Sequence, residues 1–431
     1  MSITSRAGSD RRPAAEGATT TFAALASAQY RILWIGSVVS FLAMQTQVIA
    51  RGWLAYDITG SNSGLGGVFL GFGIPMLLMS PLGGVAADRF PKRRVLQISQ
   101  AALTLNTAFV AVAIVFDFIN YGHLVASSVV QGAGFAFLGP VRMAFTGDLV
   151  GHHLLPNAVV LQQMSMNATR VLGPSVAGTL IGISWFGVGG VYCMVAVLLF
   201  VSFAITFWLP RGLPDPNKVQ RSPGRELLDG LVYVRERPQL LLLLVVSFLI
   251  VMIAFPYQAF LPSLAEDVYG VGASGYGILS AFSAVGALAA SLFIASRAGG
   301  PGAWRLQAGA GLLFAAGVLV LGLTRTFPMG VLVIMVTGAG ASAFQSLNNS
   351  LVLTNSDPVY HGRMQALMSL GFSGFGMAAL PLGMAADAIS LPTTLVLMGS
   401  VSLAVMVVAL VVRKRLNAGG HADAVATTAP V

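Results

Sequence analysis

The sequence is poor in charge and almost free of cysteine. Only 9% of its 431 residues are Asp, Glu, Lys or Arg, whereas soluble proteins carry about a quarter. A chain with so little charge cannot cover a water-facing surface, which excludes an ordinary soluble protein. The single cysteine, Cys193, excludes a disulfide framework and says nothing about the redox compartment. What the chain has instead is 56% hydrophobic residues and a mean hydropathy of +0.80.

The apolar residues fall into long runs separated by short polar breaks. A helix needs about 20 apolar residues to cross a bilayer, so these runs predict an all-α integral membrane protein. The alternating ten-residue segments of an outer-membrane barrel do not occur in the sequence. We expect twelve transmembrane helices at 31–56, 64–86, 95–117, 123–147, 158–183, 186–209, 240–262, 274–296, 303–324, 328–353, 364–387 and 390–412.

The net charge of +9 follows this predicted topology. With the N-terminus inside, nearly all of the 24 Lys and Arg residues fall in cytoplasmic segments, which is the positive-inside bias. We therefore expect a multi-pass protein of the cell (inner or plasma) membrane with both termini in the cytoplasm. The bias explains the basicity without a nucleic-acid partner.

The longest polar break divides the spans six and six. We expect a disordered cytoplasmic tail at 1–30, an N-terminal half at 31–209, a linker at 210–239, a C-terminal half at 240–412 and a cytoplasmic tail at 413–431. Within the linker, Leu227, Leu228, Leu231 and Val234 share one helical face. That pattern is typical of a short helix on the membrane surface, and an ordinary solvated loop helix is the alternative.

The few charges of the chain are concentrated between the second and third predicted spans. The segment GGVAADRFPKRRVL, residues 83–96, contains a glycine, an acid four residues later and a basic turn. It resembles the signature of the major facilitator superfamily, which occupies this same place in a chain of six plus six helices. Here Pro91 stands where that signature has glycine. The resemblance implies the major facilitator fold and transport by alternating access.

Asp88 ends its helix at the negative pole of the helix dipole, where a carboxylate needs a positive partner. In the superfamily fold that partner is the start of span 11, near Gly362–Arg363. Gly84, one turn earlier, would let the two backbones approach closely. The resemblance thus implies a cytoplasmic gating cluster of Gly84, Asp88, Arg89, Lys92 and Asp148. The alternative is that the basic residues only set the topology.

A second motif, Gly173-Pro174-Ser175-Val176-Ala177-Gly178, lies in the fifth predicted span. It resembles an element of exporting, antiport-type members, in which the position of Ala177 is usually glycine. Gly173, Pro174 and Gly178 are therefore expected to serve in the conformational change, with a generic helix kink as the alternative.

Three further stretches, YRILWIGSVVSFLAMQTQVIARGWLAYDITGS, FLGPVRMAF and RVLGPSVAG, resemble the enterobactin-exporter-like group of bacterial siderophore and drug exporters. This resemblance implies export of a small amphipathic organic molecule, coupled to the proton gradient. However, Ser128 stands where many proton-coupled exporters have arginine, and no carboxylate lies near the middle of a predicted span.

Three arginines lie inside predicted spans. Arg51 and Arg142 are each about 8 Å from a span end and are expected to reach an interface, whereas Arg170 lies near the midplane and needs partners or water. Polar residues at helical spacing accompany each arginine. The expected substrate pathway comprises Gln47, Arg51, Gln131, Arg142, Gln163, Asn167, Arg170, Tyr257, Gln258, Gln345, Asn348 and Asn349. For each Gln or Asn, hydrogen bonding between packed helices is the alternative.

The positive charges of this pathway favour a substrate with an anionic or electron-rich group. We expect no enzyme activity, cofactor or metal, because the sequence has no catalytic grouping and no phosphate-binding loop. The expected partners are the small-molecule substrate and the bilayer, with the protein a monomer. A facilitative uniporter or importer of a small metabolite on the same fold, or a non-transporting receptor or scaffold, remains the alternative.

Overall fold

The computed structural model describes residues 22–213, 223–295 and 302–427, and the described regular structure is helical. Its α-helices are α1 (Ala28–Thr59), α2 (Asn62–Arg89), α3 (Lys92–Val115), α4 (Tyr121–Ile181), α5 (Gly187–Ile205), α6 (Pro223–Arg235), α7 (Pro238–Ile253), α8 (Leu261–Ser263), α9 (Gly272–Ala295), α10 (Ala303–Leu323), α11 (Phe327–Thr354), α12 (His361–Ile389) and α13 (Leu391–Thr427). Short 3-10 or π-helical elements are η1 (Ala23–Ala26), η2 (Thr206–Trp208), η3 (Phe255–Phe260), η4 (Leu264–Val268) and η5 (Pro358–Tyr360).

Within the described residues, ten helices are long and apolar enough to cross a membrane. The other two predicted spans lie in the second part of α4, residues 152–181, and in α12, where a shorter apolar stretch covers Gly374–Ile389. The all-helical membrane architecture predicted from the sequence is thus confirmed.

Predicted spans 4 and 5 are two helices that meet at a break within α4. The chain between them turns only at Gly151, whose φ of 72° and ψ of 168° interrupt α4. Glycine adopts a positive φ at little cost, which explains why the kink lies at this residue. We refer to residues 152–181 as the second arm of α4.

The seventh predicted span, 240–262, lies within one helical stretch over Pro238–Val268, whose hydrogen-bonding pattern changes along its length. The α-helix α7 ends at Ile253 and is followed by the 3-10 turn η3, the single turn α8 and the π-helical η4. Pro256 and Pro262 lie in this stretch, and proline cannot donate the backbone hydrogen bond that continues an α-helix. Irregular backbone at membrane depth is tolerated where it is buried in protein or lines a cavity.

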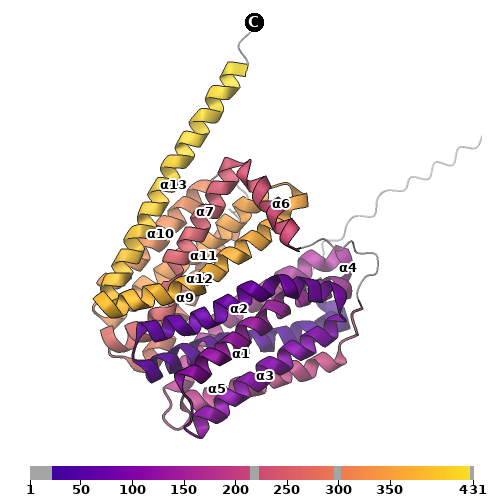
Figure 1. Ribbon diagram of the computed structural model, residues 1–431, viewed down its shortest axis with the longest axis vertical. Helices are drawn as coiled ribbons and strands as arrows, with labels where there is room; N and C mark the ends of the chain where they lie inside the picture. The colour runs from indigo at the N-terminus through magenta and orange to yellow at the C-terminus, as the bar shows by residue number, and fades with distance from the viewer. Residues whose placement is uncertain (1–21, 214–222, 296–301, 428–431) are drawn as a thin grey trace, which may run out of the picture.

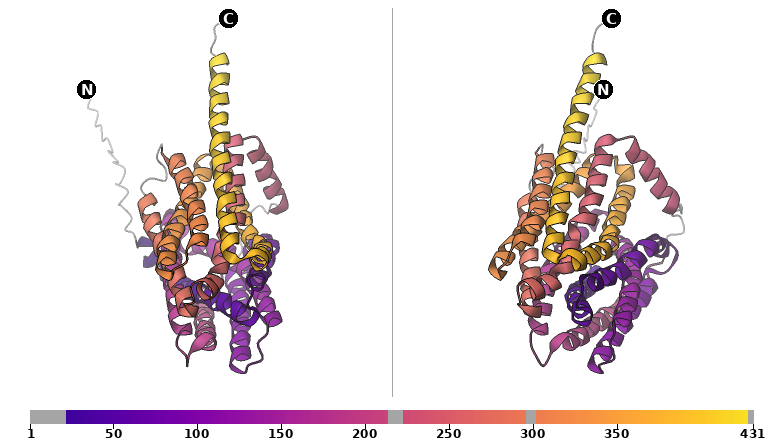
Figure 2. Two further views of the ribbon diagram at one scale, coloured as in Figure 1. Left: turned by 90° about the vertical axis from the view of Figure 1, so that its left-hand side faces the viewer. Right: turned by 60° about the vertical axis from the view of Figure 1, so that its left-hand side comes forward.

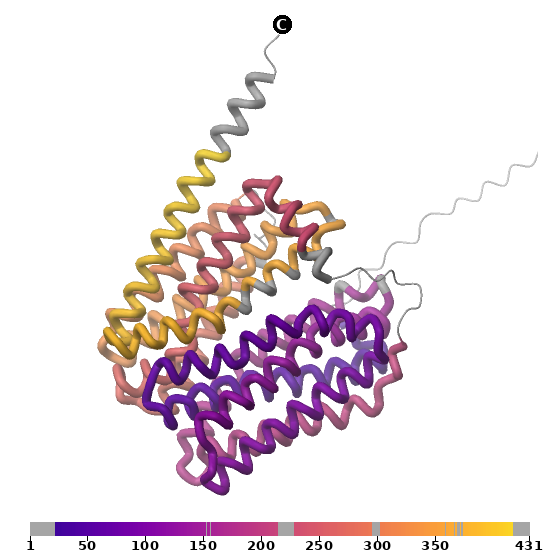
Figure 3. Tube along the Cα trace, viewed as in Figure 1, coloured from indigo at the N-terminus to yellow at the C-terminus, as the bar shows by residue number. Residues whose placement is uncertain are grey.

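The helices form two packed groups, one made of α1–α5 and the other of α7 and α9–α13 (Figure 1). Contacts between the groups run mainly along α2 with α12 and α4 with α9. Figure 3 shows that α2 begins beside the end of α12, and that the opposite ends of these helices diverge. We call the end that holds Asn62 and Ile389 the closed end, and the end that holds Arg89 and His361 the open end.

The expected linker helix is present as α6, which runs along the side of the C-terminal group (Figure 2). Of its predicted apolar face, Leu228 and Leu231 are exposed, whereas Val234 is buried. The reason is that α6 packs on α12 through Gly230, where a Cβ would lie 3.2 Å from the Cβ of Arg363. The side chain of Leu227 lies outside the described residues.

Candidate functional site

At the closed end, α2 and α12 are in backbone contact. A Cβ on Gly66 would overlap the carbonyl oxygen of Ala379, and a Cβ on Gly383 would overlap that of Asn62. Only glycine permits so close an approach, which is typical of tightly packed membrane helices. The two helix groups therefore touch here without side chains between them.

The same end has a second glycine contact between the second arm of α4 and α9. Gly178 and Gly277 lie against each other, and a Cβ on either residue would overlap the backbone of the other. Gly173, also on the second arm, packs on α1, where a Cβ would lie 2.5 Å from the Cβ of Gln45. Pro174 is buried beside it. The motif predicted from the sequence thus holds the second arm between α1 and α9.

Two carboxylates of the C-terminal group accept hydrogen bonds from the N-terminal group at the closed end. Asp387 accepts from the backbone N–H of Asn62 at 2.8 Å and from that of Ser63 at 2.9 Å. The first turn of α2 thereby gains a negative charge at its positive dipole end. Asp267 accepts a hydrogen bond from the Tyr56 hydroxyl of α1. These bonds fasten the two groups at this end.

At the open end the helices are apart, which corrects one expectation. Gly84 lies 18 residues, or five turns, after Gly66 and so on the same face of α2. A Cβ built on Gly84 would nevertheless meet no atom within 4 Å. The expected approach to α12 is absent at Gly84, and the neighbouring Gly83 packs on α4 instead, where its Cβ would overlap the carbonyl oxygen of Ala136. The face that packs on α12 at the closed end is therefore open around Gly84.

The second arm of α4 carries polar residues toward the open end on the face that packs on α9. Asn167 lies 11 residues, about three turns, before Gly178 and shares its face. Gln163 and Arg170 are exposed, and Gln163 Nε2 donates to Asn167 Oδ1 at 3.3 Å. Arg170 lies roughly 17 Å from the end of α4 at Ile181. Among the described residues, none pairs with the Arg170 guanidinium.

The opposing helix, α9, presents apolar residues at the matching depth. Ala281, Ala284 and Leu288 follow Gly277 at helical spacing and continue its face toward the open end. Leu288 is 39% exposed. Asn167 thus lies on the face of α4 that packs on α9, with the exposed Gln163 and Arg170 beside that face and the apolar residues of α9 at the same depth. This arrangement suits a molecule with one polar and one apolar side.

Other predicted pathway residues differ in their access to this region. Gln258 is exposed in η3, whereas Tyr257 is buried with its hydroxyl 3.3 Å from Ser283 Oγ. On α11, Gln345 and Asn349 are half-buried and Asn348 is buried. The side-chain oxygens of Gln345 and Asn348 have no hydrogen-bond donor among the described residues.

Arg51 does not reach an interface, contrary to expectation. It is 3% exposed and donates to Gln131 Oε1, whose own amide donates to Gln47 Oε1 at 2.6 Å. Gln47 Nε2 in turn donates to Thr107 Oγ1 at 3.1 Å. The guanidinium also lies 5.3 Å from the ring centre of Phe72. Arg51, Gln131 and Gln47 therefore join α1 to α3 and α4, as in the helix-packing alternative, and do not line the open region.

Arg142 is likewise buried rather than at an interface. Its Nη2 donates to Ser40 Oγ on α1 at 2.7 Å, and the guanidinium lies 5.1 Å from the ring centre of Phe41. Neutral dipoles and aromatic faces thus hold both buried arginines inside the N-terminal group, since snorkelling would break these contacts.

The charged segment at the open end contacts the start of the linker. Lys92 Nζ lies 2.7 Å from Asp148, so the structure brings these two predicted residues together. The Lys92 backbone N–H donates to the carbonyl oxygen of Gly212 at 2.9 Å, and Arg93 Nη1 donates to that of Leu209 at 3.0 Å. Asp88 is half-buried and Arg89 is exposed.

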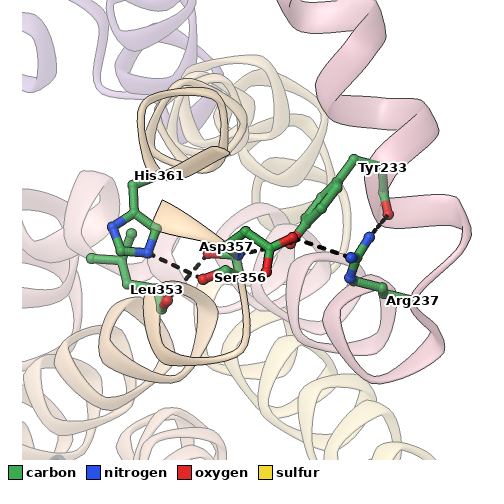
Figure 4. Close-up of polar contacts among 6 residues, drawn as sticks. All are labelled: Tyr233, Arg237, Leu353, Ser356, Asp357 and His361. Atoms are coloured by element: carbon green, nitrogen blue, oxygen red, sulfur yellow. Dashed lines mark hydrogen bonds and ion pairs between the residues drawn. The ribbon is translucent and has the colours of Figure 1, made fainter. Parts of the chain in front are cut away.

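The end of the linker is fastened to the C-terminal group (Figure 4). The Tyr233 hydroxyl lies 3.0 Å from Asp357 Oδ2, and Arg237 Nη2 lies 3.2 Å from the same oxygen. The rings of Tyr233 and Tyr360 stack at 3.8 Å. Arg363, expected near Asp88, has an ion pair with Asp229 of α6 at 3.5 Å.

Sequence reasoning missed the closed-end contacts made by α2, α9 and α12. The signal was present in the seven-residue spacing of Gly66 with Gly73 and of Gly376 with Gly383, which places each pair on one helix face. The contacts of Asp387 had no local signal, because its partners lie 324 and 325 residues away.

Comparisons with known proteins agree with this architecture. The family described as transmembrane secretion effector, in the major facilitator superfamily, matches residues 19–430. The staphyloferrin A transporter of Staphylococcus aureus is 22% identical over 80% of this chain and 86% of its own length. Macrolide efflux protein A of Streptococcus pyogenes is 21% identical over 84% of this chain and 89% of its own.

Solved structures share the fold. The nucleoside transporter NupG superimposes with a TM-score of 0.68 at 15% identity, covering 89% of this chain and 98% of its own. A bacterial homologue of the lysosomal transporter Spinster, in an inward-facing unoccupied conformation, gives 0.65 at 16% identity over 90% and 95% of the two chains. From the match over nearly its whole length, the chain belongs to the transmembrane secretion effector family of major facilitator superfamily transporters.

Proposed function

We propose that this transporter exports a small amphipathic organic molecule with an anionic or electron-rich group by alternating access. In this proposal the twelve helices form two six-helix halves, both termini are cytoplasmic, and the open end faces the cytoplasm. The structure then corresponds to the state that admits substrate from inside the cell. The efflux-type relatives support the direction of transport, and the facilitative uniporter or importer is the alternative.

The observation that carries the proposal is the exposed Arg170. Its guanidinium lies in the middle of the second arm of α4 without an acidic partner in the described chain. An unpaired cation at this depth is costly, and an anionic substrate would offset the cost. The apolar residues of α9 across from it would receive the hydrophobic part of the same molecule.

The gating residues give this proposal a mechanism. Opening to the outside requires release of the contacts of Asp387, Asp267 and Gly178, while α12 closes on the face of Gly84. Asp88, Arg89, Lys92 and Asp148 would then stabilise the closed cytoplasmic side. We further propose that the proton gradient drives the cycle, as the family resemblance implies.

Transport by Arg170→Gln, with Arg170→Lys as the matched control, tests the substrate class. Two fluorescent amphipathic substrates of the same size are compared, one with a carboxylate and one with an amine. We expect the wild type to transport the carboxylate in preference to the amine. This preference should be about tenfold smaller in Arg170→Gln, and Arg170→Lys should retain part of it. Equal transport of both substrates by wild type, or an unchanged preference in Arg170→Gln, would refute the assignment.

A further inference from the structure

A groove on the C-terminal group lies outside the proposed substrate region. It runs between α7, α10 and α13 and is open to the surroundings. Leu242, Val246 and Met406 line its apolar length, and Trp304, Gln307 and Arg413 line its polar end. Figure 2 shows α13 on the outside of this group, so the groove lies on the surface that meets the bilayer.

The polar end of the groove is positively charged. The Arg413 guanidinium lies 4.2 Å from the ring centre of Trp304, which holds it over the groove. Arg305, which follows Trp304 in the chain, lies close enough to Arg413 for the two positive charges to repel each other. Within the described residues neither arginine has an acidic partner.

Two further groups at this end favour an anion. Helix α10 begins here, at Ala303, and no side chain caps its first N–H groups, so the positive pole of a 21-residue helix points toward the same place. Gln307, one turn later, is 95% buried and lines the groove, and no described residue forms a hydrogen bond with its amide. Because Gln307 lines the groove, its unpaired amide is free to form a hydrogen bond with a polar ligand there.

We propose that this groove binds an anionic phospholipid, with its phosphate at Arg305, Arg413 and Gln307 and an acyl chain along Leu242, Val246 and Met406. A soluble anion would leave the apolar length of the groove uncovered. A zwitterionic lipid would bring its own cation to a site that already holds two uncompensated arginines. The site is separate from the proposed substrate pathway and does not depend on the direction of transport.

Lipid binding to the purified full-length chain in detergent tests the proposal. Native mass spectrometry and thermal unfolding would be measured with phosphatidylglycerol, with phosphatidylcholine of the same acyl chains, and with inorganic phosphate. We expect phosphatidylglycerol to bind and stabilise the protein, while phosphatidylcholine binds at least fivefold more weakly and phosphate has no effect at the same concentration. Equal binding of the two lipids, or equal stabilisation by phosphate, would overturn the proposal without any variant.

Variants then place the lipid in the groove. Arg305→Gln combined with Arg413→Gln should weaken phosphatidylglycerol binding about 25-fold, at roughly fivefold per arginine. Ala409→Phe, which fills the apolar groove and keeps both arginines, should also weaken it. The matched control is Arg415→Gln, an exposed arginine two positions further along α13. Unchanged binding in both groove variants, or an equal loss in the control, would contradict the assignment.

Discussion

The three intramembrane arginines are the most informative single residues of this chain. Arg51 and Arg142 are buried and donate to neutral partners, whereas Arg170 is exposed and unpaired among the described residues. Depth in the sequence predicted that Arg51 and Arg142 reach an interface, and the structure shows both buried. Depth could not show that Arg51 and Arg142 point inward, because that depends on Gln131 and Ser40 of neighbouring helices. Helical spacing places a side chain on a face, but packing decides what that face contacts.

The buried amide network predicts a large effect of a single substitution. Gln131→Leu would leave the Arg51 guanidinium without its acceptor and Gln47 Oε1 without its donor. We expect a loss of about 3 kcal/mol in the free energy of unfolding, because a buried charge would lose its partner. Thermal unfolding in detergent measures it, with Gln163→Leu on the exposed face of α4 as the control. The combined variant Arg51→Met with Gln131→Leu should recover much of the loss. Equal stability of Gln131→Leu and Gln163→Leu would contradict the role of the network.

At the scale of helices, glycine contacts join α2 to α12 and α4 to α9 at the closed end. At the open end α2 and α12 are apart (Figure 3). The sequence predicted nearly every span, since long apolar runs determine length and position. It did not predict the change from α-helical to 3-10 geometry after Ile253 or the short connection at Gly151, because both depend on single residues, Pro256 and Gly151, within otherwise helical patterns. Which helices meet across the two groups also could not be predicted, because those contacts join residues hundreds of positions apart.

Gly83 and Gly84 form a matched pair that tests the gating of α2. Gly83→Val would force a side chain into the backbone of Ala136, so we expect poor folding in every conformation. Gly84→Val has open space around it, so we expect normal folding and normal unfolding temperature. If α12 closes on this face during the cycle, the added side chain blocks that step and transport falls at least tenfold. Normal transport by a well-folded Gly84→Val would show that α2 does not close there.

At the scale of the whole molecule, the proposed orientation can be tested by labelling. Single cysteines at Asp57, Asp267 and Arg325, introduced after Cys193→Ser, should react with a membrane-impermeant reagent added outside intact cells. A cysteine at Arg93 should react only after the membrane is opened. Labelling of Arg93→Cys from outside would show that the topology is the reverse of the proposed one and that the open end faces outward.

Direction and driving force are most directly tested in inverted membrane vesicles that contain the full-length protein. With the cytoplasmic side outward, we expect an amphipathic carboxylate dye to accumulate inside the vesicles when their interior is acidic. Collapse of the pH gradient should abolish this accumulation, and vesicles with Arg170→Gln should show little of it. Accumulation only in right-side-out vesicles would establish import. Uptake that does not depend on the pH gradient would establish facilitated transport. Either result would contradict proton-driven export.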